Sequence, residues 1–256
     1  MPVPKPYRRT CRPFKDGQYP VRPKVSYIAH SEFAKAPKQY IHAFELIQKD
    51  LLELFDYVEP ADRNRDCHSL RIVELLLRTC VEVEANCKAI LRENAYGRKK
   101  NNWTMEDYKK LNRTHRLSSY QVKFPVWHGA QNVCTPFLAW SSGKGSDWYN
   151  AYNQTKHDRH AQFEQANFGN LLDAVAGLVA LIASQFHTHD FSLRPTDFSD
   201  DIDQQYLAEQ LGDFSVAIGG YFGVKFPNDW PVEQRYSFDW DRLKTEADPF
   251  QLLQIR

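Results

Sequence analysis

The sequence lacks the short motifs that identify several common classes of enzyme. No GxSxG elbow occurs, which excludes the nucleophile arrangement of the α/β-hydrolases. The segment Gly143-Lys144-Gly145 has no leading glycine and follows no predicted strand, which excludes a phosphate-binding loop of the Walker type. The formal net charge is only +1, so no overall positive field draws the chain to nucleic acid. Any contact with nucleic acid has to come from a local patch.

Cysteine is scarce and has none of the spacings of a metal site. The five cysteines include no CxxC pair, and Cys80 and Cys87 fall within an apolar helical pattern. This odd number of scattered thiols indicates buried, reduced cysteines in a cytoplasmic protein. His157 and His160 are three residues apart, but no distant Cys or His pair has the spacing that would complete a zinc site. We therefore expect no metal and no cofactor.

Segments that would carry the chain into a membrane are also missing. The basic N-terminal residues are not followed by the apolar stretch of a signal peptide. The apolar run around 174–183 is too short to span a bilayer. Mean hydropathy is −0.61, while 42% of the residues are hydrophobic. These values predict a protein with a sizeable core, located in the cytoplasm and without a membrane partner.

The sequence does have strong helical periodicity. Apolar side chains recur at three- and four-residue steps in long segments, which predicts amphipathic helices. These segments are 37–57, 69–94, 146–157 and 167–186. A capping pattern predicts a further short helix at 104–112. Alternation over 120–126 predicts a short strand or extended segment, and Pro125 within it indicates an edge. The segment 214–230 is predicted as either a strand-turn-strand or an irregular cover. The expected fold is mainly all-α, a four-helix bundle with short β and irregular appendages.

The same patterns predict three regions. An extended, proline-rich arm covers 1–36, a helical bundle with an insertion at 95–145 covers 37–190, and an irregular cover packed on this core occupies 191–256. Two interpretations of the arm stay open. It packs over the surface of the domain, or it is a basic tail that binds nucleic acid.

A polar cluster, Tyr152–His160, directly precedes the most apolar helix and is the main candidate site. Asn153 and His157 are one helical turn apart and face the same way, with Lys156 and Arg159 nearby. Histidine transfers protons near neutral pH, and Lys or Arg holds a phosphate or a developing negative charge. The cluster is therefore either a metal-independent site for RNA or a polar helix end that hydrogen-bonds its neighbour.

The window YNQTKH, Tyr152–His157, resembles the RNxxxH motif of the HEPN superfamily. Asn153 and His157 match that motif, and the position of its arginine holds Tyr152. Many HEPN proteins are metal-independent ribonucleases of toxin–antitoxin, CRISPR-associated and phage-defence systems. The wider pattern, WYNAYNQTKHDR followed by NLLDAVAGLVAL, is also similar to uncharacterised bacterial proteins with helical bundles, which implies no activity.

The resemblance implies a HEPN-like bundle, a homodimer with the motif at its interface, and RNA or a nucleotide as the ligand. In a nuclease of this kind, His157 would transfer the proton, Asn153 would orient it, and Lys156 or Arg159 would steady the phosphate. Tyrosine supplies neither a permanent charge nor a bidentate fork. The candidate catalytic residues are His157, Asn153 and Arg159, and the candidate ligand-binding residues are Tyr152, Lys156, Glu84 and His160.

Several alternatives remain at this point. Glu84 and Lys88 are spaced as a surface ion pair, or Glu84 reaches into the site to hold a cation. The run Arg63–His68 fits the bare RNxxxH pattern, but it precedes the second helix, where HEPN proteins do not carry their motif. The last alternative is that the chain is a non-enzymatic scaffold that binds a protein partner. In that case the whole polar cluster has a structural role. Whether the chain is an enzyme stays open.

Overall fold

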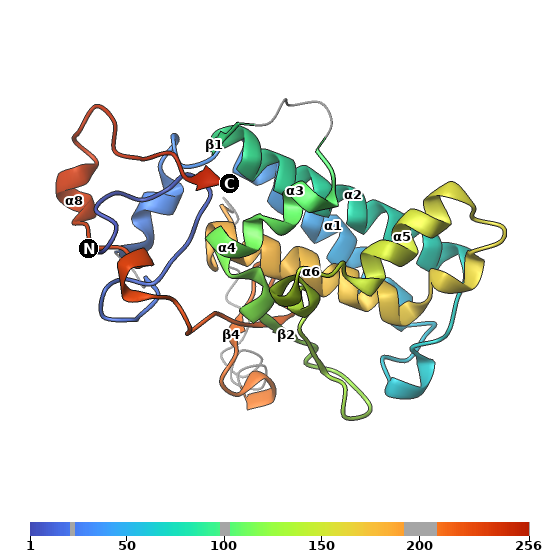
Figure 1. Cartoon of the computed structure of the whole chain (residues 1–256). Helices are drawn as coiled ribbons and strands as arrows, with labels where there is room; N and C mark the ends of the chain where they lie inside the picture. Colours follow the sequence, from blue (N-terminus) through green and yellow to red (C-terminus); the bar gives the residue numbers. More distant parts are fainter. Residues whose placement is uncertain (21–23, 98–102, 192–208, 256) are drawn as a thin grey trace.

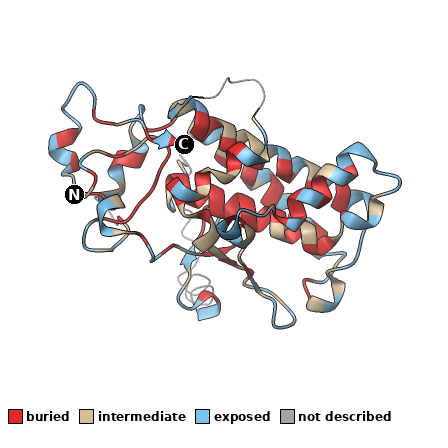
Figure 2. Ribbon diagram, in the orientation of Figure 1, coloured by how far each residue is buried: buried red, intermediate tan, exposed pale blue. Residues whose placement is uncertain are grey.

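In the computed structural model, which describes residues 1–20, 24–97, 103–191 and 209–255, the chain is mainly helical (Figure 1). The four predicted long helices are confirmed. They are α1 (Pro37–Phe55), α2 (Leu70–Glu93), α5 (Asp147–His157) and α6 (Phe168–Phe186). Helix α6 packs against the other three and forms the centre of the core, as its buried surface shows (Figure 2).

Local chemistry sets where these helices begin. The side chains of Ser69 and Asn167 each accept the amide three residues further on, at 3.2 and 2.9 Å, and so cap α2 and α6. Pro37 occupies the first turn of α1, where its missing amide costs nothing. Ser146 precedes α5, but its hydroxyl donates to the carbonyl of Pro136 at 3.2 Å and caps no helical amide.

Helix α6 is longer and more apolar than the run around 174–183 indicated. By length and composition alone it could cross a membrane, and 89% of its most apolar window is buried inside the protein. The expectation that this segment is too short was therefore wrong. Small residues let its neighbours come close: a Cβ on Gly177 would lie 3.1 Å from the ring of Trp148 on α5.

The strands of the described residues pair into two small sheets. A four-stranded antiparallel sheet has the order β3-β2-β5-β4, with β2 (Gln121–Lys123), β3 (Val133–Cys134), β4 (Ser215–Val216) and β5 (Gly223–Lys225). The strand-turn-strand within 214–230 is confirmed. The expected edge strand is instead central, because Pro125 lies beyond β2 and removes no hydrogen bond from it. A parallel pair joins β1 (Ala95–Tyr96) to β6 (Gln254–Ile255).

Short helices fill the connections. The short helix predicted at 104–112 is two: α3 (Met105–Lys109) and α4 (Leu111–His115). The others are α8 (Trp240–Leu243) and the 3-10 helices η1 (Lys24–Ala29), η2 (Asp62–Asn64), η3 (Leu117–Ser119), η4 (Leu138–Ser142), η5 (Phe163–Gln165) and η6 (Val232–Gln234). The predicted insertion, 95–145, therefore holds β1, α3, α4, β2 and β3 in its described part.

The N-terminal arm packs beside the C-terminal segment (Figure 1). Val3 and Phe14 each form a β-bridge with Tyr236, and Tyr7 forms one with Gln251. The arm also enters the interior, since the amide of Cys11 donates to a carbonyl near the end of α6 at 2.8 Å. Residues 192–208 of the predicted C-terminal cover lie outside the described residues.

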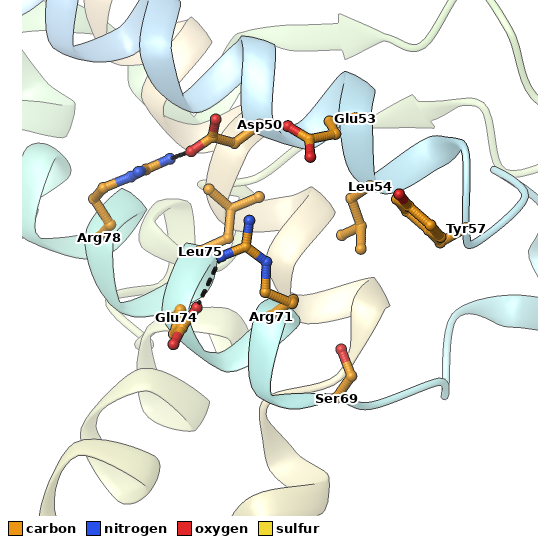
Figure 3. A pocket seen from close by; sticks show the side chains of 9 residues that line it. All are labelled: Asp50, Glu53, Leu54, Tyr57, Ser69, Arg71, Glu74, Leu75 and Arg78. Atoms are coloured by element: carbon orange, nitrogen blue, oxygen red, sulfur yellow. Dashed lines mark hydrogen bonds and ion pairs between the residues drawn. The ribbon is translucent and has the colours of Figure 1, made fainter.

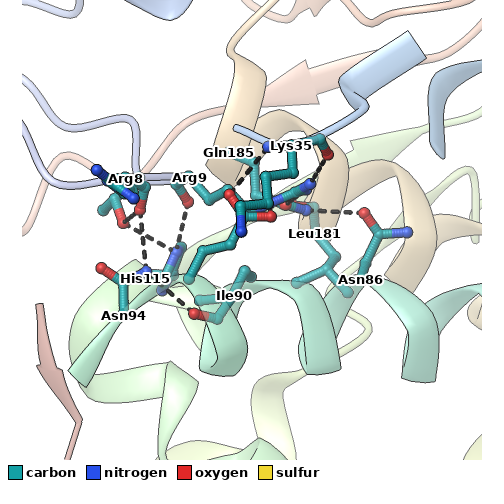
Figure 4. A network of polar contacts seen from close by, with 11 residues as sticks. Arg8, Arg9, Lys35, Asn86, Ile90, Asn94, His115, Leu181 and Gln185 are labelled. Atoms are coloured by element: carbon teal, nitrogen blue, oxygen red, sulfur yellow. Dashed lines mark hydrogen bonds and ion pairs between the residues drawn. The ribbon is translucent and has the colours of Figure 1, made fainter. Parts of the chain in front are cut away.

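A buried polar network holds the arm in place (Figure 4). The Arg9 side chain is fully buried, and its Nε donates to Glu93 at 2.7 Å while Nη1 donates to Gln185 at 3.0 Å. The carbonyl of Arg9 accepts from Nε2 of the equally buried His115 at 3.0 Å. Arg9 is therefore part of the core and does not belong to a free basic tail.

Candidate functional site

Helix α5 turns Tyr152 into the interface with α2. Only 2% of Tyr152 is exposed, and its hydroxyl donates to Oε1 of Glu84 at 3.3 Å. The hydroxyl of Tyr149, one turn earlier, donates to the same oxygen at 2.9 Å. Tyr149 was not among the predicted site residues, although its three-residue spacing from Tyr152 places both on one helix face.

Glu84 is the centre of this cluster. Its second oxygen, Oε2, accepts from Nζ of Lys88 at 2.8 Å, so the predicted surface pair forms while the carboxylate also faces α5. Burial by itself raises the pKa of Glu84, but the hydrogen bonds from Lys88 and Tyr149 outweigh it and lower the pKa. The carboxylate is therefore ionised and satisfied at neutral pH.

Lys156 joins the cluster from the last turn of α5. Its Nζ donates to the Tyr152 hydroxyl at 3.3 Å and lies 5.2 Å from the centroid of that ring. Lys156 and Lys88 thus approach the same carboxylate from two helices, and two positive charges meet one negative charge. Lys156 itself forms no ion pair with any described carboxylate.

The other predicted residues lie in solvent. His157 ends α5, so Arg159 and His160 fall in the turn that follows and not on a continued helix face. All three are exposed, and none forms a hydrogen bond or an ion pair within the described part of the chain. Asn153 is half-buried. The structure therefore brings Glu84, Tyr152 and Lys156 together and leaves the proposed catalytic side chains free.

The chemistry of the cluster follows from its protonation. Burial and then the charge of Glu84 raise the pKa of both Tyr149 and Tyr152, so their hydroxyls stay protonated and act as donors. The interior position that corresponds to the HEPN arginine is thus neutral. The positively charged side chains Lys88, Lys156 and Arg159 lie at the edge of the cluster.

The second RNxxxH match, Arg63–His68, is not assembled as a site. Nη2 of Arg65 lies 3.1 Å from both carboxylate oxygens of Asp173 on α6, and the thiol of Cys134 donates to the same carboxylate at 3.2 Å. The His68 ring packs edge-on against Phe163, with centroids 5.4 Å apart. The Arg65–Asp173 pair ties the loop before α2 to α6, and Arg65, Cys134 and Asp173 are among the residues that line a groove of about 700 Å³.

A separate groove of about 460 Å³ runs between α1 and α2 (Figure 3). Charged side chains line both walls: Arg78 on α2 pairs with Asp50 on α1, and Arg71 pairs with Glu74 within α2 at 3.3 Å. No candidate site residue lines it. Within the described ranges, no three His, Cys, Asp or Glu side chains gather in a group that could hold a metal ion.

In comparisons with known proteins, no family model, curated protein or solved structure matches the chain. The resemblance to HEPN proteins therefore rests on the motif and on the helical pattern of the sequence.

Proposed function

We propose that this chain is a HEPN-like bundle that binds RNA, or another phosphate-bearing ligand, without cleaving it. The observation that carries the proposal is the exposed, positively charged end of α5. Lys156, His157, Arg159 and His160 lie there, with the exposed Asp158 between His157 and Arg159, and none of these four side chains forms an ion pair with a described carboxylate. Exposed Lys and Arg side chains that are not engaged in an ion pair are the groups that contact phosphates.

The absence of cleavage follows from Tyr152. A HEPN-type reaction needs an arginine beside the histidine to stabilise charge on the scissile phosphate. Here that position holds a neutral hydroxyl that is already donated to Glu84 at 3.3 Å. His157 supplies a proton-transfer group, but the motif position beside it holds no arginine guanidinium to bind the phosphate through two hydrogen bonds.

A scaffold without any ligand is the second candidate. The hydrogen bonds from Tyr149 and Tyr152 to Glu84 favour it, because they join α2 to α5 and give the polar cluster a structural role. This candidate does not account for the exposed cations beyond Lys156. The homodimer, a further protein partner, the defence setting and the cytoplasmic location stay predictions from the sequence.

Equilibrium binding of a fluorescent single-stranded RNA, without added metal, tests the proposal. Arg159→Glu should weaken binding and lower the dependence of affinity on salt, because one phosphate contact is lost. Arg242→Glu is the matched control, since Arg242 on α8 is exposed and undergoes the same change of charge. Equal loss in both variants would mean that the effect is one of net charge alone.

A cleavage assay on the same RNA decides between binding and catalysis. We expect no metal-independent cleavage by the wild type. Cleavage that His157→Ala abolishes while the melting temperature is kept would show that the chain is a nuclease. No binding by the wild type at low salt would leave the scaffold as the function.

A further inference from the structure

We infer that the C-terminal end of α2 carries a platform on which single-stranded RNA stacks its bases. The platform consists of Arg92, Tyr96, Trp103 and Lys110. This inference rests on the proposed function and assigns to the RNA a second contact surface, outside the candidate motif. It names unpaired nucleotides as the part of the ligand that is bound.

The platform alternates cations with aromatic rings. The guanidinium carbon of Arg92 lies 5.9 Å from the centroid of Trp103, and Nζ of Lys110 lies 5.3 Å from that of Tyr96. The two rings contact each other edge to face, with centroids 5.8 Å apart and planes at 62°. Arg92 is exposed on α2, while the other three side chains are half-buried and held in place.

Three elements build this arrangement. Arg92 belongs to the last turn of α2, Tyr96 to β1, and Trp103 and Lys110 flank α3, which lies against α2 (Figure 1). The pairing of β1 with β6 fixes the backbone at Tyr96. The rings therefore do not have to be ordered when a ligand binds, which reduces the entropic cost of association.

The charge around the platform is positive. The described residues between 88 and 116 include six Lys or Arg side chains and three acids. Two of the acids point inward: Glu93 pairs with the buried Arg9 at 2.7 Å, and Asp107 is 1% exposed and accepts the amide of Thr104 at 2.8 Å. Within this stretch only Glu106 presents a carboxylate to solvent, while Glu84 pairs with Lys88 and Asp229 pairs with Arg116 from outside it. Such a surface attracts a polyanion although the net charge of the chain is small.

The groups present suit unpaired nucleotides. Every base has a flat face that can stack on an aromatic ring or on a guanidinium plane, and neighbouring Lys and Arg side chains bind the phosphates. In a duplex those faces are already covered by adjacent base pairs. The platform therefore selects single strands and has little preference for sequence.

The platform continues the proposed site along one face of α2. Glu84, Lys88 and Arg92 follow at four-residue intervals and so lie one above the other on the helix, about 6 Å apart along its axis. A strand whose phosphates contact Lys156 at the end of α5 can therefore pass Lys88 and reach the rings. The end of α5 and the platform therefore form one continuous binding surface for the strand.

The test compares Arg92 variants of the full-length chain by fluorescence anisotropy with single-stranded oligoadenylate. We expect Arg92→Glu to weaken binding about tenfold, the effect of losing one stacked base and its phosphate. Arg92→Lys keeps the charge but not the plane, so it should lower affinity for oligoadenylate more than for the poorly stacking oligouridylate. Arg242→Glu serves as the control, and duplex RNA of the same length should bind more weakly than the single strand.

Three outcomes would overturn the platform. If Arg92→Glu binds as the wild type does while Arg159→Glu is weakened, the platform is wrong and the proposed function stands. If duplex RNA binds as tightly as the single strand, stacking is not the mode of binding. If the wild type binds no nucleic acid, the platform and the proposed function fail together. For a wild type that does bind the single-stranded RNA, a matched single-stranded DNA separates RNA from DNA as the source of the same chemistry.

Discussion

The hydroxyl of Tyr152 donates a hydrogen bond to Glu84 across the interface between α5 and α2, at 3.3 Å. Tyr152 stands where the RNxxxH motif has its arginine, so the position that would hold the phosphate in a nuclease holds two helices together here. Its neighbour Asn153 is half-buried, and the helix-terminal His157 is exposed. The same short motif therefore divides into a structural half and an exposed half.

The bond between Tyr149 and Glu84 should stabilise the fold. Tyr149→Phe removes a 2.9 Å hydrogen bond to a largely buried carboxylate, and we expect a loss of about 1–2 kcal/mol in the free energy of unfolding. Urea denaturation measures this loss. Tyr57→Phe is the control, because Tyr57 is 81% exposed, and it should leave stability unchanged. Equal stability of Tyr149→Phe and the wild type would contradict the structural role of the bond.

Arg9 should be among the residues most sensitive to substitution. Arg9→Ala leaves Glu93 without its partner in the interior, and removing one member of a buried ion pair costs about 3–5 kcal/mol. Thermal unfolding should show a large fall in melting temperature. Lys15→Ala, in the same arm but exposed, should have little effect. If both variants melt with the wild type, the arm is not anchored through Arg9.

The fold should lose stability in mild acid because of His115. Burial lowers the pKa of this ring to about 4 from the ordinary 6.5, so between these values the unfolded chain binds a proton that the folded chain does not. Stability is thus complete above about pH 6.5 and decreases as the pH falls toward about 4, by about 3 kcal/mol in total.

Unfolding measured at several pH values tests this effect. His115→Gln should reduce the dependence over that window, whatever its effect on stability at neutral pH, and the remainder should come from His187, whose pKa burial also lowers to about 4. His157→Gln, at an exposed position, should keep the slope of the wild type. An unchanged slope in His115→Gln would show that other groups cause the acid sensitivity.

Thiol reactivity should distinguish one cysteine from the other four. Cys67 is exposed, whereas Cys11, Cys80, Cys87 and Cys134 are buried. Burial raises the pKa of these four thiols, to about 12 for Cys11, so they are protonated as well as inaccessible. An aromatic disulfide reagent should modify one thiol rapidly in the native protein and five after denaturation. Cys67→Ser should abolish the rapid phase, and a second fast thiol would indicate an opening of the core.

Features that depend on neighbours in the sequence were predictable. The periodicity of apolar residues gave the four long helices to within a few residues, and Ser69 and Asn167 cap two of them through local hydrogen bonds. The prediction of an edge strand from Pro125 was wrong. A proline removes a hydrogen bond between strands only if it lies within the paired residues, and the sequence did not show where the pairing ends. Since β2 stops two residues earlier, its ladder on both sides is intact.

The candidate site was located by the sequence but not resolved by it. Periodicity placed Tyr152, Lys156 and Glu84 on two helices, without indicating which faces of these helices meet. Packing of α5 on α2 decided that Tyr152 and Tyr149 both serve Glu84 and that His157 stays outside. The end of α5 at residue 157 also removed Arg159 from the helix face on which the motif would need it.

The basic N-terminal arm shows the same division most clearly. Its prolines determine an extended chain, because they fix the backbone and remove amide donors. Whether its arginines meet solvent or the core depends on residues far away in sequence: Glu93 and Gln185 are 84 and 176 positions from Arg9. Sequence by itself thus determined which segments are helical, since helix formation is governed by contacts within a few residues. Only the tertiary structure decided which charges are buried as partners and which remain free to bind a ligand, because ion pairs form between side chains that the fold brings together.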